Sequence, residues 1–253
     1  MGAYDHPEYY EIAFSYQDVK RQVDYFETVS KRYRRVGARR FLDLGCGPSP
    51  QLREIARRRY EAVGLDLNPK TLHYLQRKAA EEDLRVETVL ADMRDFDLRE
   101  ECDFATTLSG SLYVSSNHEF MGHLACVANA LNYGGIYLLE NVALGLEPRY
   151  GERWTMKKGD ISVETVFESV LVDPLQQLYK ERLTLRAREH GTLHEFTSTA
   201  RIKHFAPQEF KSLVESSRSF AFLGFFHHLS LKPMTKLKKD NVVLMQKLPK
   251  SRH

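Results

Sequence analysis

Short apolar runs alternate with amphipathic segments along the middle of the chain. The apolar runs occupy residues 40–44, 62–67, 86–91, 104–108 and 135–140. Between them, apolar side chains recur every three or four positions, the period of a helix packed on a sheet. This spacing predicts helices at residues 50–59, 69–82 and 118–131. Alternating strands and helices predict a doubly wound α/β sheet that binds ligands at the carboxyl ends of its strands.

The pattern changes on both sides of this region. Residues 8–36 keep helical spacing, which predicts a helical cap over residues 1–37. Residues 142–204 hold three alternating segments rich in β-branched and aromatic residues, which predict a three-stranded antiparallel insertion. A helix and two final strands then return to the first fold. We expect a Rossmann-like, mostly parallel seven-stranded sheet formed by residues 38–141 and 205–250.

Composition and charge narrow the class of protein only slightly. At 253 residues with 42% hydrophobic side chains, the chain can bury one large core, and disorder is not expected. A net charge of +3 is too small to imply nucleic acid. Three cysteines without framework spacing predict reduced thiols in a cytoplasmic protein. We expect neither a signal peptide nor a membrane span, because no apolar run approaches about 20 residues.

A glycine-rich turn follows the first expected strand. Residues 41–50 read FLDLGCGPSP, and residues 64–69 read GLDLNP. Gly45 and Gly47 let the backbone approach a ligand closely, and Asp66 can accept both hydroxyls of a ribose. This arrangement is the plan of a nucleoside-binding βαβ unit.

Further details favour one nucleoside cofactor over others. A dinucleotide fingerprint would need a third glycine where Pro50 stands, so NAD and FAD fit poorly. Asp43 suits an ammonium group better than a phosphate. At the end of the third expected strand, in LADMRDF, Asp92 can bind the adenine amine and Met93 can cover the ring. The three signals lie at successive strand ends.

Together these motifs resemble the class I S-adenosylmethionine (SAM) methyltransferases, over residues 38–141 by motif and 205–248 by topology alone. The resemblance implies SAM as cofactor and S-adenosylhomocysteine (SAH) as product. One departure is Ser49, where many relatives carry glycine; a small residue is acceptable at that helix start. The implied cofactor contacts are Asp43 at the ammonium, Gly45, Cys46 and Gly47 along the methionine, Asp66 at the ribose, Leu67 and Met93 around the adenine, Asp92 at its amine, and Leu108 and Ser109 near the methyl group.

Within that class the chain is most similar to small-molecule enzymes, especially amino-sugar and glycine N-methyltransferase-like proteins. The shared features are YDHPEYYEIAFSY near the N-terminus, ADMRDF, and a β insertion that caps the active site in such enzymes. The stretch LSGSLYVSS, at residues 108–116, lacks the proline-rich signature of enzymes that modify nucleic-acid bases. The resemblance therefore implies methyl transfer to a nitrogen, or an oxygen, of a small molecule.

Several polar and aromatic residues are candidates for catalysis and substrate binding. Glu140 stands at the end of the fifth expected strand, where it could orient an acceptor and take its proton, or simply cap the strand. Tyr16 and Tyr113 could face the acceptor, although core packing explains Tyr16 equally well. Candidate substrate contacts are Asn141, Trp154 and Arg201. For Trp154 the alternative is that it anchors the β insertion, which would act as a lid, and for Arg201 it is a solvated strand face.

Three other possibilities stay open from the residues alone. The stretch KRYRRVGARR and the run Arg57, Arg58 and Arg59 would suit a tRNA or rRNA methyltransferase, or a set of solvated helix ends. The chain could also be a catalytically silent SAM-binding partner subunit. Apolar residues on both faces of the insertion suggest a homodimer surface as well as a lid. No metal is expected, since His118 and His123 lie five residues apart, off helical ligand spacing.

Overall fold

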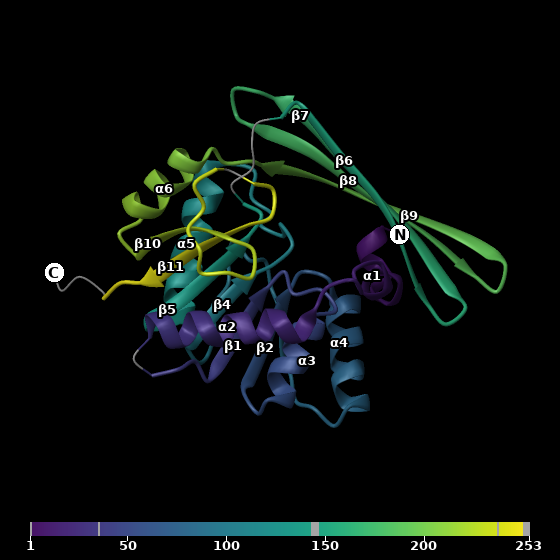
Figure 1. Ribbon diagram of the computed structural model, residues 1–253, viewed down its shortest axis with the longest axis horizontal. Helices are drawn as coiled ribbons and strands as arrows, with labels where there is room; N and C mark the ends of the chain where they lie inside the picture. The colour runs from purple at the N-terminus through teal and green to yellow at the C-terminus, as the bar shows by residue number, and fades with distance from the viewer. Residues whose placement is uncertain (1, 35, 143–146, 237, 250–253) are drawn as a thin grey trace.

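Two separate sheets form the framework of the chain (Figure 1). The computed structural model describes residues 2–34, 36–142, 147–236 and 238–249. The larger sheet has seven strands in the order β10-β11-β5-β4-β1-β2-β3. They are β1 (Arg40–Leu44), β2 (Glu61–Asp66), β3 (Glu87–Leu90), β4 (Cys102–Thr107), β5 (Leu131–Glu140), β10 (Phe220–His227) and β11 (Asn241–Lys247).

The direction of the strands confirms the Rossmann-like fold. Strands β1 to β5 pair in parallel, whereas β11 runs antiparallel to β5 and β10 antiparallel to β11. The strand order reverses between β1 and β4. In open α/β sheets the ligand crevice lies at this reversal, beyond the carboxyl ends of the strands.

Helices cover both faces of the larger sheet. On one face, Phe26, Leu52 and Leu75 of three helices share a buried cluster with the sheet, and on the other Phe120 and Phe210 do so. The helices of the first face are α2 (Val19–Tyr33), α3 (Pro50–Arg57) and α4 (Pro69–Glu81); those of the second are α5 (Asn117–Ala130) and α6 (Pro207–Ser216). None of the helices in the described part of the chain is long and apolar enough to cross a membrane.

The helical spacing of residues 8–36 is divided between two helices. A short 3-10 turn, η1 (Ala3–Asp5), precedes α1 (Pro7–Ala13), and α2 starts only at Val19. Asp18 causes the break, because its carboxylate accepts a hydrogen bond of 3.1 Å from the backbone N–H of Arg21 and caps α2. The break lets α1 leave the larger sheet and pack elsewhere.

The insertion forms four strands rather than the three predicted; residues 143–146 of the predicted insertion lie outside the described residues. The strands are β6 (Arg149–Lys158), β7 (Ile161–Asp173), β8 (Leu178–Glu189) and β9 (Thr192–Lys203), paired antiparallel in that order. The prediction missed β6 because its sequence, RYGERWTMKK, carries few apolar residues and is mostly exposed. We call these four strands the lid sheet.

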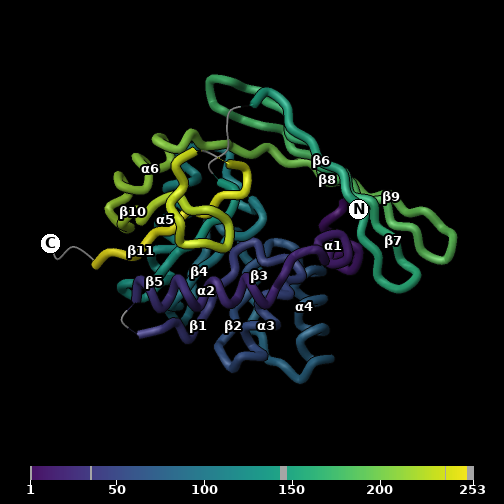
Figure 2. The backbone as a smooth tube through the Cα atoms, viewed as in Figure 1, coloured from purple at the N-terminus to yellow at the C-terminus, as the bar shows by residue number. Residues whose placement is uncertain are grey.

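The lid sheet is long and twisted, and α1 lies against one of its faces (Figures 1 and 2). A third buried cluster joins the two, with Tyr9 and Ile12 of the N-terminal segment packed among Val163, Leu183 and Leu185. This face, the inner face, is therefore held in place by α1 rather than by the helices of the main domain.

Candidate active site

The glycine turn after β1 has the backbone that its sequence predicts. Gly45 and Gly47 both have left-handed φ angles, +64° and +58°. The N–H of Gly47 donates a hydrogen bond of 2.8 Å to Oδ2 of Asp66, which ties the turn to the end of β2. A Cβ on Gly45 would lie 2.8 Å from Cε of Met93, whereas one on Gly47 would meet no heavy atom within 4 Å. Gly47 thus leaves an open side where a ligand can approach the backbone.

Asp43 lies beneath this turn and is almost fully buried. Its two carboxylate oxygens accept hydrogen bonds of 2.8 Å from the hydroxyls of Ser49 and Thr106. Burial raises the pKa of Asp43 to about 7 despite these two bonds. Ser49 has a φ of +28°, which explains why glycine suits this position, and its hydroxyl also caps α3 by accepting from the N–H of Leu52. A cationic group beside Asp43 would favour the ionised carboxylate.

The acids at the ends of β2 and β3 differ in their surroundings. Burial raises the pKa of Asp66, whose carboxylate also accepts a bond of 2.8 Å from the N–H of Asn68. Asp92 is held by the guanidinium and N–H of Arg94, which lower its pKa. The two predicted adenine contacts also differ, since Leu67 is 67% exposed whereas Met93 is buried against the turn.

A cavity of about 350 Å³ opens beside the glycine turn. It is lined by predicted cofactor residues, by α1 and the segment after it, and by the last two residues of β6. Its predicted lining residues are Asp43, Gly45, Cys46, Gly47, Leu108 and Ser109, whereas Asp66, Leu67, Asp92 and Met93 do not line it. Burial raises the pKa of the Cys46 thiol well above its ordinary value, so Cys46 acts here as a small neutral wall residue.

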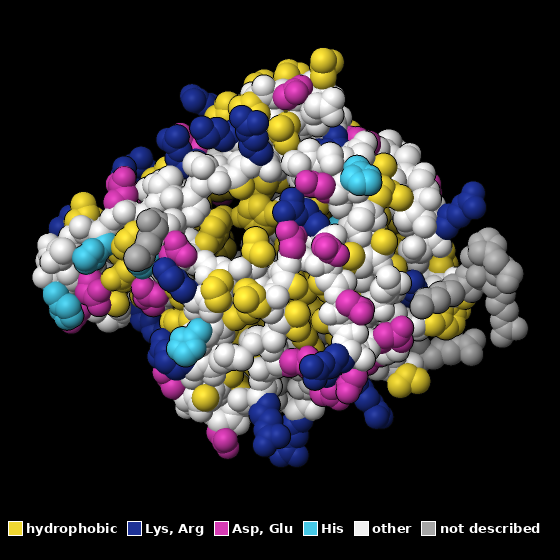
Figure 3. Space-filling model, turned by 180° about the vertical axis from the view of Figure 1, so that it is seen from behind, with side chains coloured by type: hydrophobic (Ala, Val, Ile, Leu, Met, Phe, Trp, Pro, Cys, Tyr) yellow, Lys and Arg dark blue, Asp and Glu magenta, His cyan; other side chains and the backbone are white. Residues whose placement is uncertain are grey.

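A larger cavity of about 950 Å³ lies between the lid sheet and the main domain. Figure 3 shows a hollow in this region of the surface with hydrophobic side chains around it. Ten Phe, Tyr and Trp side chains line the cavity: Tyr4, Tyr10, Phe14, Tyr16, Tyr113, Tyr150, Trp154, Phe167, Tyr179 and Phe205. The two cavities share the lining residues Tyr10, Phe14, Gln17, Ser109 and Ser111. They are therefore neighbouring compartments that meet at these residues.

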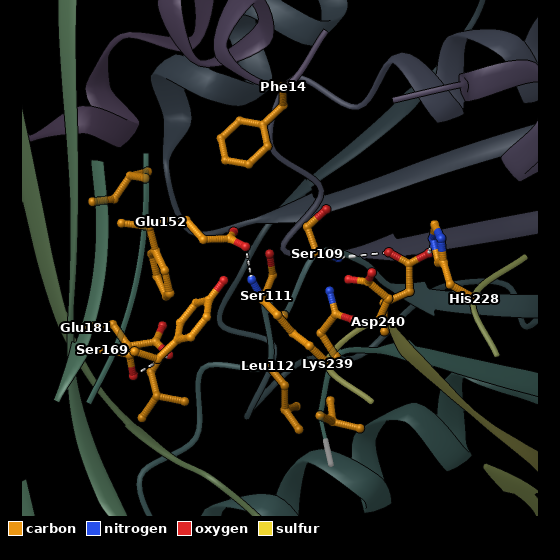
Figure 4. Close-up of a pocket in the computed structure, with 18 of the residues that line it drawn as sticks. Phe14, Ser109, Ser111, Leu112, Glu152, Ser169, Glu181, His228, Lys239 and Asp240 are labelled. Carbon is orange, nitrogen blue, oxygen red and sulfur yellow. Dashed lines mark hydrogen bonds and ion pairs between the residues drawn. The ribbon is translucent and has the colours of Figure 1, made fainter. Parts of the chain in front are cut away.

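All three predicted catalytic residues line the larger cavity. Glu140 is buried, and its oxygens accept from the N–H of Ser109 at 3.0 Å and pair with Nε2 of His228 at 3.2 Å (Figure 4). The same carboxylate raises the pKa of His228. Tyr113 shares a hydrogen bond of 2.5 Å with the hydroxyl of Tyr4. Tyr16 is 58% exposed and lies between α1 and α2 rather than on a helix.

Two of the three predicted substrate contacts also line this cavity. Asn141 does so while its N–H donates to the carbonyl of Asn241 at 2.8 Å. Trp154 lines it and also anchors the lid sheet, since its Nε1–H donates to the carbonyl of Ala13 at 2.7 Å. Arg201 does not line the cavity. It is exposed on the outer face of β9, because its neighbour Ile202 points inward and side chains alternate along a strand.

Several lining residues were not singled out by the sequence. Tyr10 lines both cavities and stacks on Phe14 with ring centroids 4.4 Å apart. Tyr10 belongs to the aromatic run YDHPEYYEIAFSY, but the sequence alone does not show which of these side chains face a cavity, because that depends on where α1 packs. On the lid sheet, Glu181 pairs with Nε2 of His204 at 3.0 Å. Glu152 forms an ion pair with Lys239, which reaches it from the opposite side of the cavity (Figure 4).

His123 supports the site from within the core. Its Nδ1–H donates to the carbonyl of Met93 at 2.8 Å, so its Nε2 accepts from the hydroxyl of Tyr137 at 2.6 Å. Burial lowers the pKa of His123 to about 4. The ring is therefore neutral and holds the loop after β3. Among the residues with described positions, no group of three or more His, Cys, Asp or Glu is arranged to hold a metal.

This buried histidine predicts a loss of stability in acid. Below about pH 6.5 His123 becomes protonated in the unfolded chain, whereas in the folded chain it stays neutral down to about pH 4. The free energy of unfolding therefore falls by about 3 kcal/mol as the pH drops through that window. His123→Gln, which cannot titrate, should flatten the decline. The measurement is the urea midpoint at a series of pH values for both proteins. An equally steep decline in the variant would contradict the assignment.

Most of the basic clusters that suggested RNA are neutralised by acidic partners. Arg34 pairs with Asp103 at 2.7 Å, and Arg58 pairs with Asp24 at 2.6 Å. Further ion pairs join Arg40 to Glu61 and Glu87, and Arg57 to Glu54 and Glu82. These pairs favour the interpretation of solvated, internally paired helix ends over a phosphate-binding groove.

Comparison with known proteins gives the same class of fold. Residues 41–135 match a family described as methyltransferase domain. A search of curated proteins found no match. The structure resembles a SAM-dependent methyltransferase from Clostridium acetobutylicum, at 15% identity over 96% of this chain and 97% of that one, with a TM-score of 0.77.

Two further solved structures are sugar-modifying enzymes. The sugar N-methyltransferase KedS8 from Streptoalloteichus is 16% identical over 98% of this chain and 94% of its own, with a TM-score of 0.76. The SAM-bound amino pentose methyltransferase CalS10 from Micromonospora echinaspora is 20% identical over 94% and 96%, with a TM-score of 0.69. At these identities the likeness establishes the fold.

The chain has the class I SAM-dependent methyltransferase fold, with a methyltransferase domain at residues 41–135. Its whole-length likeness to small-molecule enzymes includes the regions that hold the N-terminal cap and the lid sheet. The resemblance predicted from the motifs is confirmed.

Proposed function

We propose that this protein binds SAM in the smaller cavity and transfers its methyl group to a nitrogen of a small molecule in the larger one. The observation that carries the proposal is the junction of the two cavities at Tyr10, Phe14, Gln17, Ser109 and Ser111. A donor beside the glycine turn and an acceptor beneath the lid sheet can meet only at such a junction. Proximity and orientation supply most of the rate in this kind of displacement.

The residues of the smaller cavity fit the cofactor. The open side of Gly47 leaves room for a ligand against the backbone, and buried Asp43 offers a carboxylate to an ammonium group. Asp66 does not line this cavity, but it stands at the end of β2 and its carboxylate is fixed by two backbone N–H groups, one of them from the lining residue Gly47. When bound, SAM supplies an activated methyl group on a sulfonium.

The chain's own groups then orient the acceptor and exclude water. Glu140 fixes the N–H of Ser109 at the junction, so we assign it a positioning role. The hydroxyl pair of Tyr4 and Tyr113 lies in the wall of the larger cavity, where it can orient an amine by hydrogen bonds. The lid sheet covers the cavity, which keeps water from the reacting atoms. Nitrogen is favoured because the similar structures include sugar N-methyltransferases.

Binding and transfer test this proposal separately. Calorimetry should show SAM and SAH binding in the micromolar range, about −7 to −9 kcal/mol, and no binding of NAD or FAD. Transfer is then measured as SAH release from a panel of amino sugars and other amines, each paired with its hydroxyl counterpart. Binding without release from any member would favour a silent partner subunit. Release from the hydroxyl compounds alone would replace nitrogen by oxygen as the acceptor.

A further inference from the structure

Two lysines of the lid sheet, Lys157 and Lys158, line the smaller cavity. Lys157 lies 110 residues after Gly47 of the glycine turn in the sequence. Lys157 and Lys158 end β6, and Gly159, with a φ of +57°, opens the two-residue turn that leads into β7. Register across this hairpin pairs Lys158 with Ile161, so the turn is tight. Neither lysine lines the larger cavity. The end of this hairpin therefore belongs to the cofactor compartment rather than to the acceptor compartment.

The charges around the smaller cavity are divided between two poles. Its charged lining residues are Glu11, Asp43, Lys157 and Lys158. Glu11 is already paired with Arg53 and accepts a hydrogen bond from the hydroxyl of Tyr74. Asp43 is then the available anionic pole, and the two lysines are the cationic pole within the described part of the chain. A ligand that carries an ammonium and a carboxylate on adjacent groups matches this division.

We infer that Lys157 and Lys158 bind the α-carboxylate of the methionine part of the cofactor and so tie the lid sheet to the glycine turn. This inference rests on the proposed function, since it assigns one end of the same ligand. The hairpin has a fixed base for this contact, because Trp154 of β6 donates to the carbonyl of Ala13 at the end of α1. Tyr10 and Phe14, on α1 and just after it, line both cavities.

One consequence is a coupling between the binding of cofactor and acceptor. The strands that end at Lys158 and begin at Ile161 also carry Trp154 and Phe167, which line the acceptor cavity. A carboxylate held at the hairpin end would steady that wall. The cofactor and the acceptor are thus expected to raise each other's affinity by the same factor.

The test compares SAM with decarboxylated SAM, which keeps the ammonium and sulfonium but lacks the carboxylate. The double variant Lys157→Met and Lys158→Met should lose roughly tenfold in affinity for SAM, as expected for two partly exposed ion pairs, and nothing for the decarboxylated compound. Lys180→Met is the matched control, because Lys180 is an exposed lysine of the lid sheet that lines neither cavity. It should leave both affinities unchanged.

Each outcome separates the inference from the proposed function. Equal losses for the two compounds, or no loss for either, would overturn the role of the lysines while SAM binding stands. Failure of the unaltered protein to bind both compounds would instead remove the cofactor proposal itself. Hydrogen exchange gives a second readout. SAH should slow exchange in residues 155–163, and 5′-methylthioadenosine, which lacks the whole amino-acid part, should not; equal protection by both would contradict the tie.

Discussion

Asp66→Ala should weaken SAH binding by about a hundredfold or more. Without the Asp66 carboxylate, the ribose hydroxyls would lose two charge-assisted hydrogen bonds, each worth about 1.5–3 kcal/mol. A hundredfold loss of affinity corresponds to about 2.7 kcal/mol. The same side chain also accepts from the N–H groups of Gly47 and Asn68, so the glycine turn would loosen as well. Calorimetric titration with SAH measures the loss directly.

Two companions make this result interpretable. Asp66→Asn keeps one acceptor oxygen and should fall between the unaltered protein and the alanine variant. Asp92→Ala is the matched comparison, because Asp92 also follows a strand of the same sheet but its carboxylate is already hydrogen-bonded to the guanidinium of Arg94. It should cost about tenfold or less, the worth of one hydrogen bond from the adenine amine. An Asp66→Ala protein that folds normally and binds SAH unchanged would remove the ribose assignment.

The glycine-turn side of the candidate site could be predicted because its signals are local. Gly45 and Gly47 lie on one turn and Asp66 ends the adjacent strand, so parallel pairing alone brings them together. The features of Ser49 are equally local. Its left-handed backbone, its cap on α3 and its bond to Asp43 all follow from one small polar residue at a helix start. Long-range packing hardly alters such features.

The lid-sheet side of the candidate site could be predicted only in outline, because the direction of its side chains depends on strand register. Arg201 and Ile202 are neighbours in sequence, yet a shift of one residue moves a side chain to the other face of the sheet. The alternating sequence pattern of β9 does not determine which face of the strand packs toward α1. That choice is made by Tyr9, Ile12 and their contacts on the inner face of the lid sheet. A local pattern contains no information on such contacts.

The helix break at Asp18 and the strand β6 were missed for a related reason. Apolar spacing continues through residues 14–18, where turn hydrogen bonds and the cap that Asp18 forms on α2 interrupt the helix. Strand β6 is mostly exposed and is held by its pairing with β7. Both features depend on hydrogen bonds rather than on burial, and hydrophobic periodicity detects burial. The lysines at the end of β6 went unnoticed with it.

Trp154→Ala should lower the rate of methyl transfer by about a hundredfold while weakening SAH binding by no more than about tenfold, the loss expected for the lysine contact at the end of β6. The indole holds the lid sheet on α1 through its bond to the carbonyl of Ala13, and its ring meets those of Phe14 and Tyr16 edge-on, with centroids 5.5 and 6.2 Å apart. Its loss would widen the acceptor cavity and admit water. A displacement of about 1 Å at the reacting groups is enough for a hundredfold loss of rate.

Trp154→Phe separates the two parts of this role. Phenylalanine keeps a ring against Phe14 and Tyr16 but has no N–H to donate, so it should lose about tenfold or less, the worth of one hydrogen bond. SAH release with the best acceptor of the panel gives the rate, and calorimetry gives the affinity. The smaller cavity is not lined by Trp154, so a variant that folds and binds SAH normally isolates the acceptor side. Normal transfer by the alanine variant would mean that the lid sheet does not shape the acceptor cavity, because that variant lacks both the ring and the bond that hold β6 over it.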